Sequence, residues 1–267
     1  MAEALLSGKV ILVTGSVRGI GEAIARRAVE EGARVMIHGP EEQEARRIAA
    51  TFGEAAGYVG ANLEDDAAPA RIIAATMERF GRIDGLVNNA ALTSRSNLDT
   101  TNEALFDRLM RVNVRAPLFL IKSALPHFRK QGGGVVLNIG SVNAYCGEPN
   151  LLVYSMTKGA LMTMTRNLAD AHAAEGIRVN QLNVGWTLTE NERRQKEIDG
   201  LGPDWEASLP ELFAPAGRIF RPHEIAAHAV FWLSDATGPV TGSVYEIEQH
   251  PFIGRNPDKV LFQEHSA

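Results

Sequence analysis

The residues best suited to move protons in this chain are Ser141, Tyr154 and Lys158. On a helix, Tyr154 and Lys158 lie one turn apart and share a face. A free tyrosine has a pKa of about 10, so its phenol needs help to exchange protons near neutral pH. A nearby lysine ammonium favours the ionised form and is expected to lower the pKa. The spacing therefore makes Tyr154 a candidate general acid or base, although such a pair also occurs on ordinary exposed helices.

A glycine-rich loop near the start of the chain stands between a predicted strand and a predicted helix. Residues 9–14 read KVILVT, Gly15, Gly19 and Gly21 follow, and residues 22–31 have helical composition. Glycines allow close approach to a pyrophosphate, and the free N–H groups at the start of a helix attract phosphate charge. This context predicts a dinucleotide site, whereas glycines alone mark only turns.

The rest of the chain alternates between short β-rich runs and helical patterns. Further strands are predicted at residues 34–38, 56–61, 83–88, 134–139, 177–184 and 243–247, and further helices at 41–52, 67–80, 100–128, 153–174 and 222–233. A threonine cap at Thr100 and Thr101 and a bend at Pro117 are expected in the helix 100–128. The alternation predicts a single domain over residues 1–267, of the α/β class, with a doubly wound parallel sheet of about seven strands and helices on both faces. Ligands bind beyond the carboxyl ends of such strands, where Ser141 stands.

Composition narrows the class of protein. The chain has 267 residues, 45% of them hydrophobic, which is enough for a substantial core. A net charge of -5 with scattered Lys and Arg gives no basic face for nucleic acid. We expect a cytoplasmic protein with no membrane segment and no internal disulfide, since Cys146 is the single cysteine. No metal is expected, because His223 and His228 lack the spacing of a zinc helix.

Several motifs, in order, resemble those of the short-chain dehydrogenase/reductase family. They are T-G-x-x-x-G-I-G at 14–21, NNAA at 88–91, Asn113, Ser141, YSMTK at 154–158 and RVN at 178–180, and they cover nearly the whole chain. The resemblance implies a Rossmann-like fold and an NAD(P)-dependent oxidoreductase that transfers hydride between a nicotinamide and a secondary alcohol or ketone. It also implies a homotetramer built on long helices, where Leu161, Met162 and Met164 fit either a subunit interface or core packing.

The resemblance also implies roles for individual residues. Tyr154 would exchange a proton with the substrate oxygen, Ser141 would hold that oxygen, Lys158 would lower the pKa of Tyr154 and bind the nicotinamide ribose, and Asn113 would help to order a water. The implied cofactor-binding residues are Gly15, Ser16, Arg18, Gly19, Ile20, Gly21, His38, Gly39, Asn62, Leu63, Asn89, Ala90, Tyr154, Lys158, Val184, Gly185 and Thr187.

Departures from the family pattern concern the cofactor site. Ala91 replaces a usual glycine, and Asn183 stands where a proline is common, so the following loop is expected to be less rigid. Cofactor choice is read at the end of the second strand, where His38 and Gly39 provide no carboxylate to repel a 2'-phosphate. Arg18 also favours NADP in this family, although it fits a solvated loop arginine equally well.

The substrate is less strongly indicated. Residues 187–215 suggest a mobile lid, with Trp186 at its root as a surface on which a sugar ring can stack. With Asn143, Glu148 and Asn150 nearby, a sugar, polyol or related hydroxy compound is favoured, and a 3-oxoacyl thioester is the alternative. A catalytically silent dinucleotide-binding sensor is an alternative of another class. Residues 250–267 form a C-terminal tail that either covers a neighbouring site or is disordered.

Overall fold

The computed structural model describes residues 4–202 and 204–251, and seven parallel strands in that part of the chain form one sheet. The strands are β1 (Val10–Val13), β2 (Arg34–Gly39), β3 (Ala56–Gly60), β4 (Gly85–Asn88), β5 (Gly134–Ile139), β6 (Ile177–Val184) and β7 (Val244–Ile247). Their order is β3-β2-β1-β4-β5-β6-β7, so the direction of winding reverses between β1 and β4. The predicted doubly wound parallel sheet is confirmed, and its switch point is where such folds bind ligands.

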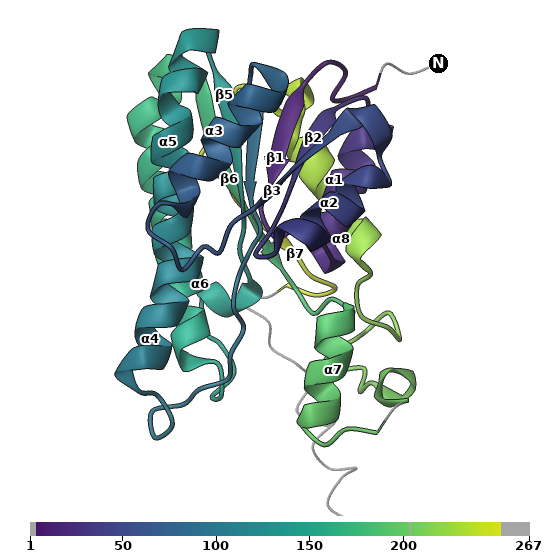
Figure 1. Cartoon of the computed structure of the whole chain (residues 1–267). Helices are drawn as coiled ribbons and strands as arrows, with labels where there is room; N and C mark the ends of the chain where they lie inside the picture. The colour runs from purple at the N-terminus through teal and green to yellow at the C-terminus, as the bar shows by residue number, and fades with distance from the viewer. Residues whose placement is uncertain (1–3, 203, 252–267) are drawn as a thin grey trace, which may run out of the picture.

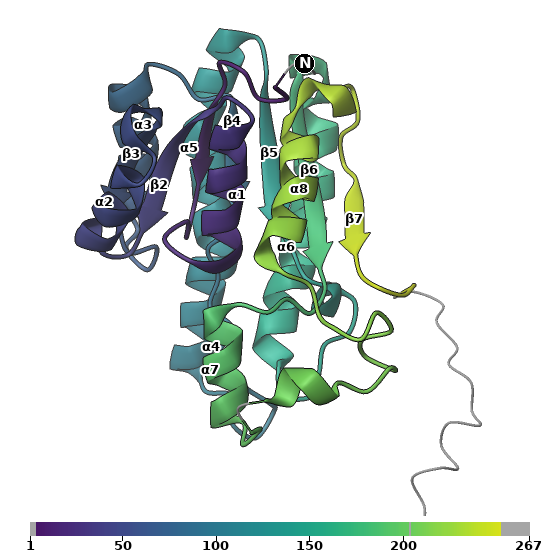
Figure 2. The ribbon, with the colours of Figure 1, turned by 90° about the vertical axis from the view of Figure 1, so that its right-hand side faces the viewer.

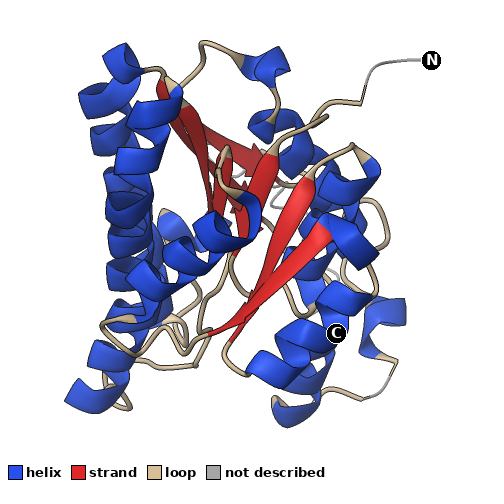
Figure 3. Cartoon of the chain, turned by 45° about the horizontal axis from the view of Figure 1, so that its top comes forward, coloured by secondary structure: helices blue, strands red, loops and turns tan. Residues whose placement is uncertain are grey.

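Helices cover both faces of this sheet (Figures 1 and 3). On one face lie α1 (Gly19–Glu30), α2 (Glu42–Ala50) and α8 (Pro222–Leu233), and on the other α3 (Ala68–Phe80), α5 (Ala116–Gln131) and α6 (Leu152–His172). Each set packs apolar side chains against the sheet, as Ile24 and Ala28 do from α1 and Leu120 and Phe128 from α5. Because strands such as β1 are buried on both faces, they read as continuous apolar runs.

The helix predicted at residues 100–128 is interrupted. It consists of α4 (Glu103–Met110), a π-helical turn (Arg111–Arg115) and α5. Pro117 has no N–H for the carbonyl of Asn113 four residues earlier, and the Ala116 N–H bonds to Arg111, five residues back. The expected threonine cap is wrong, because the side chain of Asn102 caps α4 by accepting the Leu105 N–H at 2.9 Å.

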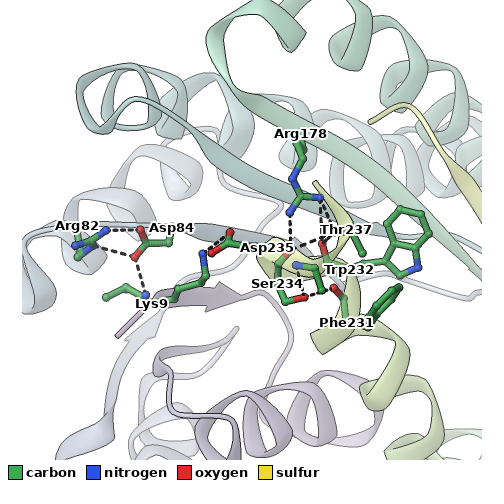
Figure 4. Close-up of polar contacts among 11 residues, drawn as sticks. Lys9, Arg82, Asp84, Arg178, Phe231, Trp232, Ser234, Asp235 and Thr237 are labelled. Atoms are coloured by element: carbon green, nitrogen blue, oxygen red, sulfur yellow. Dashed lines mark hydrogen bonds and ion pairs between the residues drawn. The ribbon is translucent and has the colours of Figure 1, made fainter. Parts of the chain in front are cut away.

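Polar contacts join the amino ends of several strands to the segments around them (Figure 4). Arg178 at the start of β6 donates to the Thr237 hydroxyl at 2.9 Å and to the Ser234 carbonyl at 2.9 Å. Asp84 accepts the Val10 N–H at 2.8 Å and pairs with a neighbouring arginine. Arg178, part of the RVN motif, therefore supports the fold here. Among the described residues, every helix is too short or too polar to cross a membrane.

The chain between β6 and α8 forms a separate layer beyond the carboxyl ends of the strands (Figures 1 and 2). It contains α7 (Glu190–Ile198) and a short 3-10 turn (Trp205–Ser208). Its two ends are held together, since Leu188 N–H donates to the Phe220 carbonyl at 2.8 Å. A small apolar cluster of Leu188, Trp205, Ala214 and Ile219 fills its interior. This segment, 188–219, corresponds to the predicted lid and is called the lid below.

Candidate active site

Ser141 and Tyr154 meet at the carboxyl end of β5. Ser141 is buried and caps a short 3-10 turn (Val142–Ala144), where its hydroxyl accepts the Asn143 N–H at 3.2 Å. Tyr154 lies in the first turn of α6, and the Ser141 side chain is close enough to influence its phenol. Burial raises the pKa of Tyr154 to about 12, the Ser141 hydroxyl opposes that rise, and the charge of Glu192 adds to it. The phenol therefore keeps its proton at neutral pH.

Lys158 lies beside Tyr154, as its spacing predicts, but its electrostatic effect differs from the expectation. Its ammonium is 5.6 Å from the centre of the Tyr154 ring and donates to the Ile139 carbonyl at 2.7 Å. Burial lowers the pKa of Lys158 to about 8. The expected lowering of the Tyr154 pKa by Lys158 is wrong for this structure, because desolvation of the phenol dominates.

Asn113 sits in the π-helical turn next to the same helix. Its side-chain amide accepts the Leu92 N–H at 2.8 Å, donates to the Leu92 carbonyl at 2.9 Å and donates to the Thr157 hydroxyl at 3.1 Å. The side chain thus ties the loop after β4 to the residue that precedes Lys158. The predicted role in ordering a water stays a prediction.

The glycine loop has the geometry that a dinucleotide phosphate requires. Gly15 and Gly19 have φ of +63° and +59°, a region that favours glycine. A Cβ on Gly21 would fall 2.4 Å from both the Asn89 amide nitrogen and the Gly15 carbonyl oxygen, so only glycine fits there. The N-terminus of α1 opens beside this cradle, and its free N–H groups suit a pyrophosphate. The residues present therefore fit a dinucleotide.

Thr14 and Asn89 hold the glycine loop against the segment that follows β4. Thr14, fully buried, accepts the N–H groups of Asn89 and Ala90 on its hydroxyl at 3.0 and 3.1 Å. The Asn89 amide donates in turn to the Thr14 and Gly15 carbonyls at 2.8 and 3.2 Å. Asn89 and Ala90, predicted as cofactor contacts, thus pack against the loop itself. Thr14 was not predicted as a site residue, although it opens the glycine motif.

The predicted cofactor contacts Ser16 and His38 point into the protein. The Ser16 hydroxyl donates to the Val13 carbonyl at 2.7 Å and accepts the His38 N–H at 2.9 Å. The His38 ring is 2% exposed and bonded on both nitrogens, and burial lowers its pKa to about 4. His38 therefore cannot meet a 2'-phosphate with its side chain, which leaves that position to Gly39 and Arg18.

Arg18 is already paired. Its guanidinium donates to both carboxylate oxygens of Glu44 in α2, at 3.0 and 2.8 Å. The Arg18 side chain remains 64% exposed, so the pair contributes at most about 1 kcal/mol. A phosphate at this position would compete with Glu44 for the same guanidinium. The sequence alone gave no signal for this pairing, since the two residues are distant in the chain.

The other predicted cofactor residues line the carboxyl edge of the sheet. Asn62 is exposed and its side chain accepts the Glu64 N–H at 3.0 Å, whereas Leu63 is buried. Asn183 lies within β6 opposite Glu246 of β7, so this position belongs to the strand, and the lower rigidity of the following loop stays a prediction. Of the remaining predicted residues, Ile20 packs on the core and Val184 ends β6. The Gly185 N–H donates to the Ile247 carbonyl at 2.9 Å. The Thr187 hydroxyl donates to the Gly185 carbonyl at 3.1 Å.

Glu192 of the lid is a charged residue that acts on Tyr154 and was not predicted. It lies in the first turn of α7, where its N–H is capped by the Thr189 hydroxyl at 3.1 Å. Its carboxylate accepts the Trp186 indole N–H at 2.7 Å and lies 3.8 Å from the Lys196 ammonium. These contacts fix a carboxylate close enough to Tyr154 to raise the pKa of its phenol.

Trp186 differs from its expected role as a sugar platform. Its ring stacks on Trp205 with centroids 5.3 Å apart and an interplanar angle of 12°. The Lys196 ammonium lies 5.0 Å from the Trp186 centroid. Trp186 therefore packs against the apolar cluster inside the lid, and the polar residues around it are better placed to meet a substrate.

A salt bridge joins the lid to the loop after β4. Arg95 donates to both carboxylate oxygens of Asp199, at 3.1 and 2.6 Å, and lies 3.8 Å from Glu148. Arg95 is 20% exposed and Asp199 25%, so solvent screens the pair only partly. The contact fixes the end of α7 against the loops that follow β4 and β5.

The residues that follow β7 hold the other end of the lid. Gln249 accepts the Ala216 N–H at 2.9 Å and donates to the Arg218 carbonyl at 2.7 Å. The lid is therefore attached to the segment after β7 by these two hydrogen bonds. Of the predicted tail 250–267, residues 252–267 lie outside the described part of the chain.

Comparisons with known proteins agree with the motifs. A family model described as "Enoyl-(Acyl carrier protein) reductase" matches residues 15–249. An uncharacterized oxidoreductase of Thermotoga maritima is 36% identical, over 90% of this chain and 96% of the relative. L-fucose dehydrogenase of Mus musculus is also 36% identical, over 86% of this chain and 84% of the relative. The crystal structure of 3-ketoacyl-(acyl-carrier-protein) reductase from Brucella melitensis complexed with NADH matches with a TM-score of 0.80 and 32% identity, over 91% of this chain and 97% of that one.

Proposed function

Because the chain belongs to the short-chain dehydrogenase/reductase family and is an NAD(P)-dependent oxidoreductase of alcohols and ketones, we propose that Ser141, Tyr154 and Lys158 carry its reaction. The observation that carries this proposal is that the three side chains gather at the end of β5: the Ser141 hydroxyl acts on the Tyr154 phenol, and the Lys158 ammonium lies 5.6 Å from the Tyr154 ring centre and 2.7 Å from the Ile139 carbonyl. All three groups stand at the carboxyl end of the sheet, as does the glycine loop after β1, and this is the edge at which such sheets bind ligands.

The protonation states favour carbonyl reduction. A nicotinamide cofactor, when bound, supplies the hydride that the substrate carbon receives. Tyr154, whose pKa of about 12 keeps the phenol protonated, donates its proton to the substrate oxygen. Ser141 holds that oxygen by a second hydrogen bond, and Lys158, whose ammonium lies 5.6 Å from the centre of the Tyr154 ring, binds the nicotinamide ribose. The product is a secondary alcohol.

The substrate we propose is a sugar, a polyol or a related hydroxy compound. Support comes from the similarity to L-fucose dehydrogenase and from the polar side of the lid, where Glu192 is a fixed hydrogen-bond acceptor near Tyr154. Asn143, Glu148 and Asn150 follow β5 in the same region. A 3-oxoacyl thioester remains the second candidate, supported by the similarity to the reductase of Brucella melitensis.

Reduction rates across a panel of keto sugars, oxidised polyols and 3-oxoacyl thioesters test this choice. We expect turnover of the hydroxylated carbonyl compounds with NADPH or NADH. Activity confined to thioesters would remove the sugar proposal. Cofactor binding without turnover on the whole panel would favour the catalytically silent sensor.

For the cofactor we propose NADP over NAD. Position 39 is a glycine, so no carboxylate side chain there repels a 2'-phosphate, and the Arg18 guanidinium lies at the glycine loop. Glu44 weakens this preference by occupying Arg18. Replacing Glu44 with Gln is expected to raise the ratio of kcat/KM for NADPH to that for NADH several-fold, whereas Glu42→Gln in the same helix serves as the matched control. Equal ratios in the two variants would contradict the role of Arg18.

We also propose a homotetramer, a single domain and a cytoplasmic location. Leu161 is 1% exposed and Met164 packs on the core, so these two residues serve the interior of the subunit. Leu118 and Met156, on α5 and α6, are 39% and 50% exposed and are better candidates for a subunit contact. Sedimentation velocity of the wild type and of Met156→Glu tests the assembly, and a wild type that sediments as a monomer would contradict it.

A further inference from the structure

We infer that His38 is a positioning residue that locks together two loops of the nucleotide site, the glycine loop after β1 and the loop after β3. The inference rests on the proposed use of these loops to bind the cofactor. It gives His38 a role different from that expected of its position, where a side chain usually contacts the adenosine ribose. The ring points inward and is bonded at both nitrogens.

The two ring contacts define one tautomer. The Gly15 N–H donates to Nδ1 at 3.1 Å, so Nδ1 carries no proton. Nε2 lies 2.9 Å from the Ala61 carbonyl oxygen, which can only accept, so Nε2 carries the proton. A neutral imidazole with this tautomer satisfies both loops at once, and a side chain with a single functional group cannot do the same.

The backbone of His38 adds to the same connection. Its N–H donates to the Ser16 hydroxyl at 2.9 Å, and its carbonyl accepts the Ser16 N–H at 2.9 Å. The next residue, Gly39, accepts the Ala61 N–H at 3.0 Å. The end of β2 is therefore attached to both neighbouring loops, and the imidazole ring bridges the gap between them.

The bridge matters because each loop is proposed to hold a different part of the nucleotide. Gly15, with φ of +63°, begins the cradle for the pyrophosphate, and its N–H would be left without this acceptor if the ring were removed. Ala61 directly precedes Asn62 and Leu63, the proposed contacts of the adenine. The ring thus sets the separation between the two ends of the adenosine diphosphate site. Its loss should weaken cofactor binding and leave the chemistry at Tyr154 unchanged.

Three substitutions separate the two contacts. In His38→Asn, the amide oxygen can take the place of Nδ1 as acceptor for Gly15, but the side chain is too short to reach Ala61. In His38→Gln, the amide nitrogen can take the place of Nε2 as donor to Ala61, but the acceptor for Gly15 is lost. His38→Leu removes both contacts, and the leucine side chain is similar in size to that of histidine. His223→Asn, which changes an exposed histidine in α8, is the control.

The experiment is a fluorescence titration of each purified full-length protein with NADPH and with NADH, followed by kcat at saturating cofactor. We expect the dissociation constant to rise roughly tenfold or more in His38→Leu, since the partly buried Gly15 N–H and the buried Ala61 carbonyl lose their partners. Asn and Gln should give intermediate values, each a several-fold rise, and kcat should stay within about twofold of the wild type in every variant.

The outcomes distinguish this inference from the proposed function. Binding by the Asn and Gln variants as tight as that of the wild type would overturn the role of His38, and so would a loss of kcat at unchanged affinity. These two variants keep a polar side chain and decide the matter if His38→Leu does not fold. If the wild type binds neither nucleotide, the proposed function fails instead.

Discussion

The buried His38 ring predicts a specific loss of stability in acid. Burial lowers its pKa from the ordinary 6.5 to about 4 in the folded protein, while the unfolded chain keeps the ordinary value. Between these values the unfolded state binds more protons, so the free energy of unfolding falls as the pH falls from 6.5 toward 4. Because the ring is 2% exposed, solvent does not screen this effect.

The size of the effect follows from the two pKa values. Linkage between pH 7.5 and pH 5.0 gives a loss of about 2 kcal/mol from this one histidine. The full loss, reached below pH 4, is about 3 kcal/mol. His38→Asn cannot be protonated, so its free energy of unfolding should fall less steeply over the same range, even though it begins lower at pH 7.5 because the contact to Ala61 is gone.

Urea unfolding of the cofactor-free protein at pH 7.5, 6.5, 5.5 and 5.0 measures this difference. The gap between wild type and His38→Asn should shrink by about 2 kcal/mol from pH 7.5 to pH 5.0. His223→Asn should follow the wild type, since that side chain is exposed in α8. A gap that stays constant with pH would refute the reasoning, because it would mean that His38 has the same pKa folded and unfolded.

Two further predictions concern the lid. Glu192→Gln removes a charge that raises the pKa of Tyr154, so the alkaline limb of kcat/KM for carbonyl reduction should move to lower pH, while the exposed Glu197→Gln on the same helix leaves it in place. An unmoved limb would show that Glu192 does not act on the phenol. Arg95→Ala should speed tryptic cleavage within α7 about fivefold by removing a pair worth about 1 kcal/mol. The double variant Arg95→Asp with Asp199→Arg should restore resistance to trypsin. Equal cleavage rates in the wild type and in both variants would contradict the role of this salt bridge.

The fold was predictable because its signals are local and repeated. Apolar runs such as residues 10–13 are buried on both faces of the sheet, and the helices between them bury one apolar side each. The π-helical turn at Arg111–Arg115 was not predicted, although Pro117 marks its place. A proline interrupts the bond to the residue four positions earlier, and sequence does not reveal whether the helix bends or takes an extra residue into one turn.

The candidate site was predictable where its residues lie on elements that are neighbours in the chain. Ser141, Tyr154 and Lys158 come together because β5 and α6 are adjacent in the chain and in space. The direction in which the Tyr154 pKa shifts was not predictable from spacing, because it depends on how far burial removes the phenol from water. Spacing by one helical turn brings the Tyr154 and Lys158 side chains near each other, but it does not decide whether the lysine charge or the desolvation of the phenol has the larger effect on the pKa.

Contacts between distant segments could not be read from the sequence. Arg18 pairs with Glu44 and Arg95 with Asp199, and neither pair has a signal in composition or spacing. The inward direction of His38 depends on the loop after β3, where the Ala61 carbonyl accepts a hydrogen bond from the ring. Such contacts are set by the packing of whole elements.

The measurement that tests the central claim most directly compares Tyr154→Phe with the wild type in both cofactor binding and turnover. The substitution keeps the ring beside Lys158 and removes only the hydroxyl that donates the proton. We predict an unchanged dissociation constant for NADPH or NADH and a fall in kcat of at least about a hundredfold, the usual contribution of a positioned acid. Turnover within a few-fold of the wild type would contradict the assignment of Tyr154 as the acid.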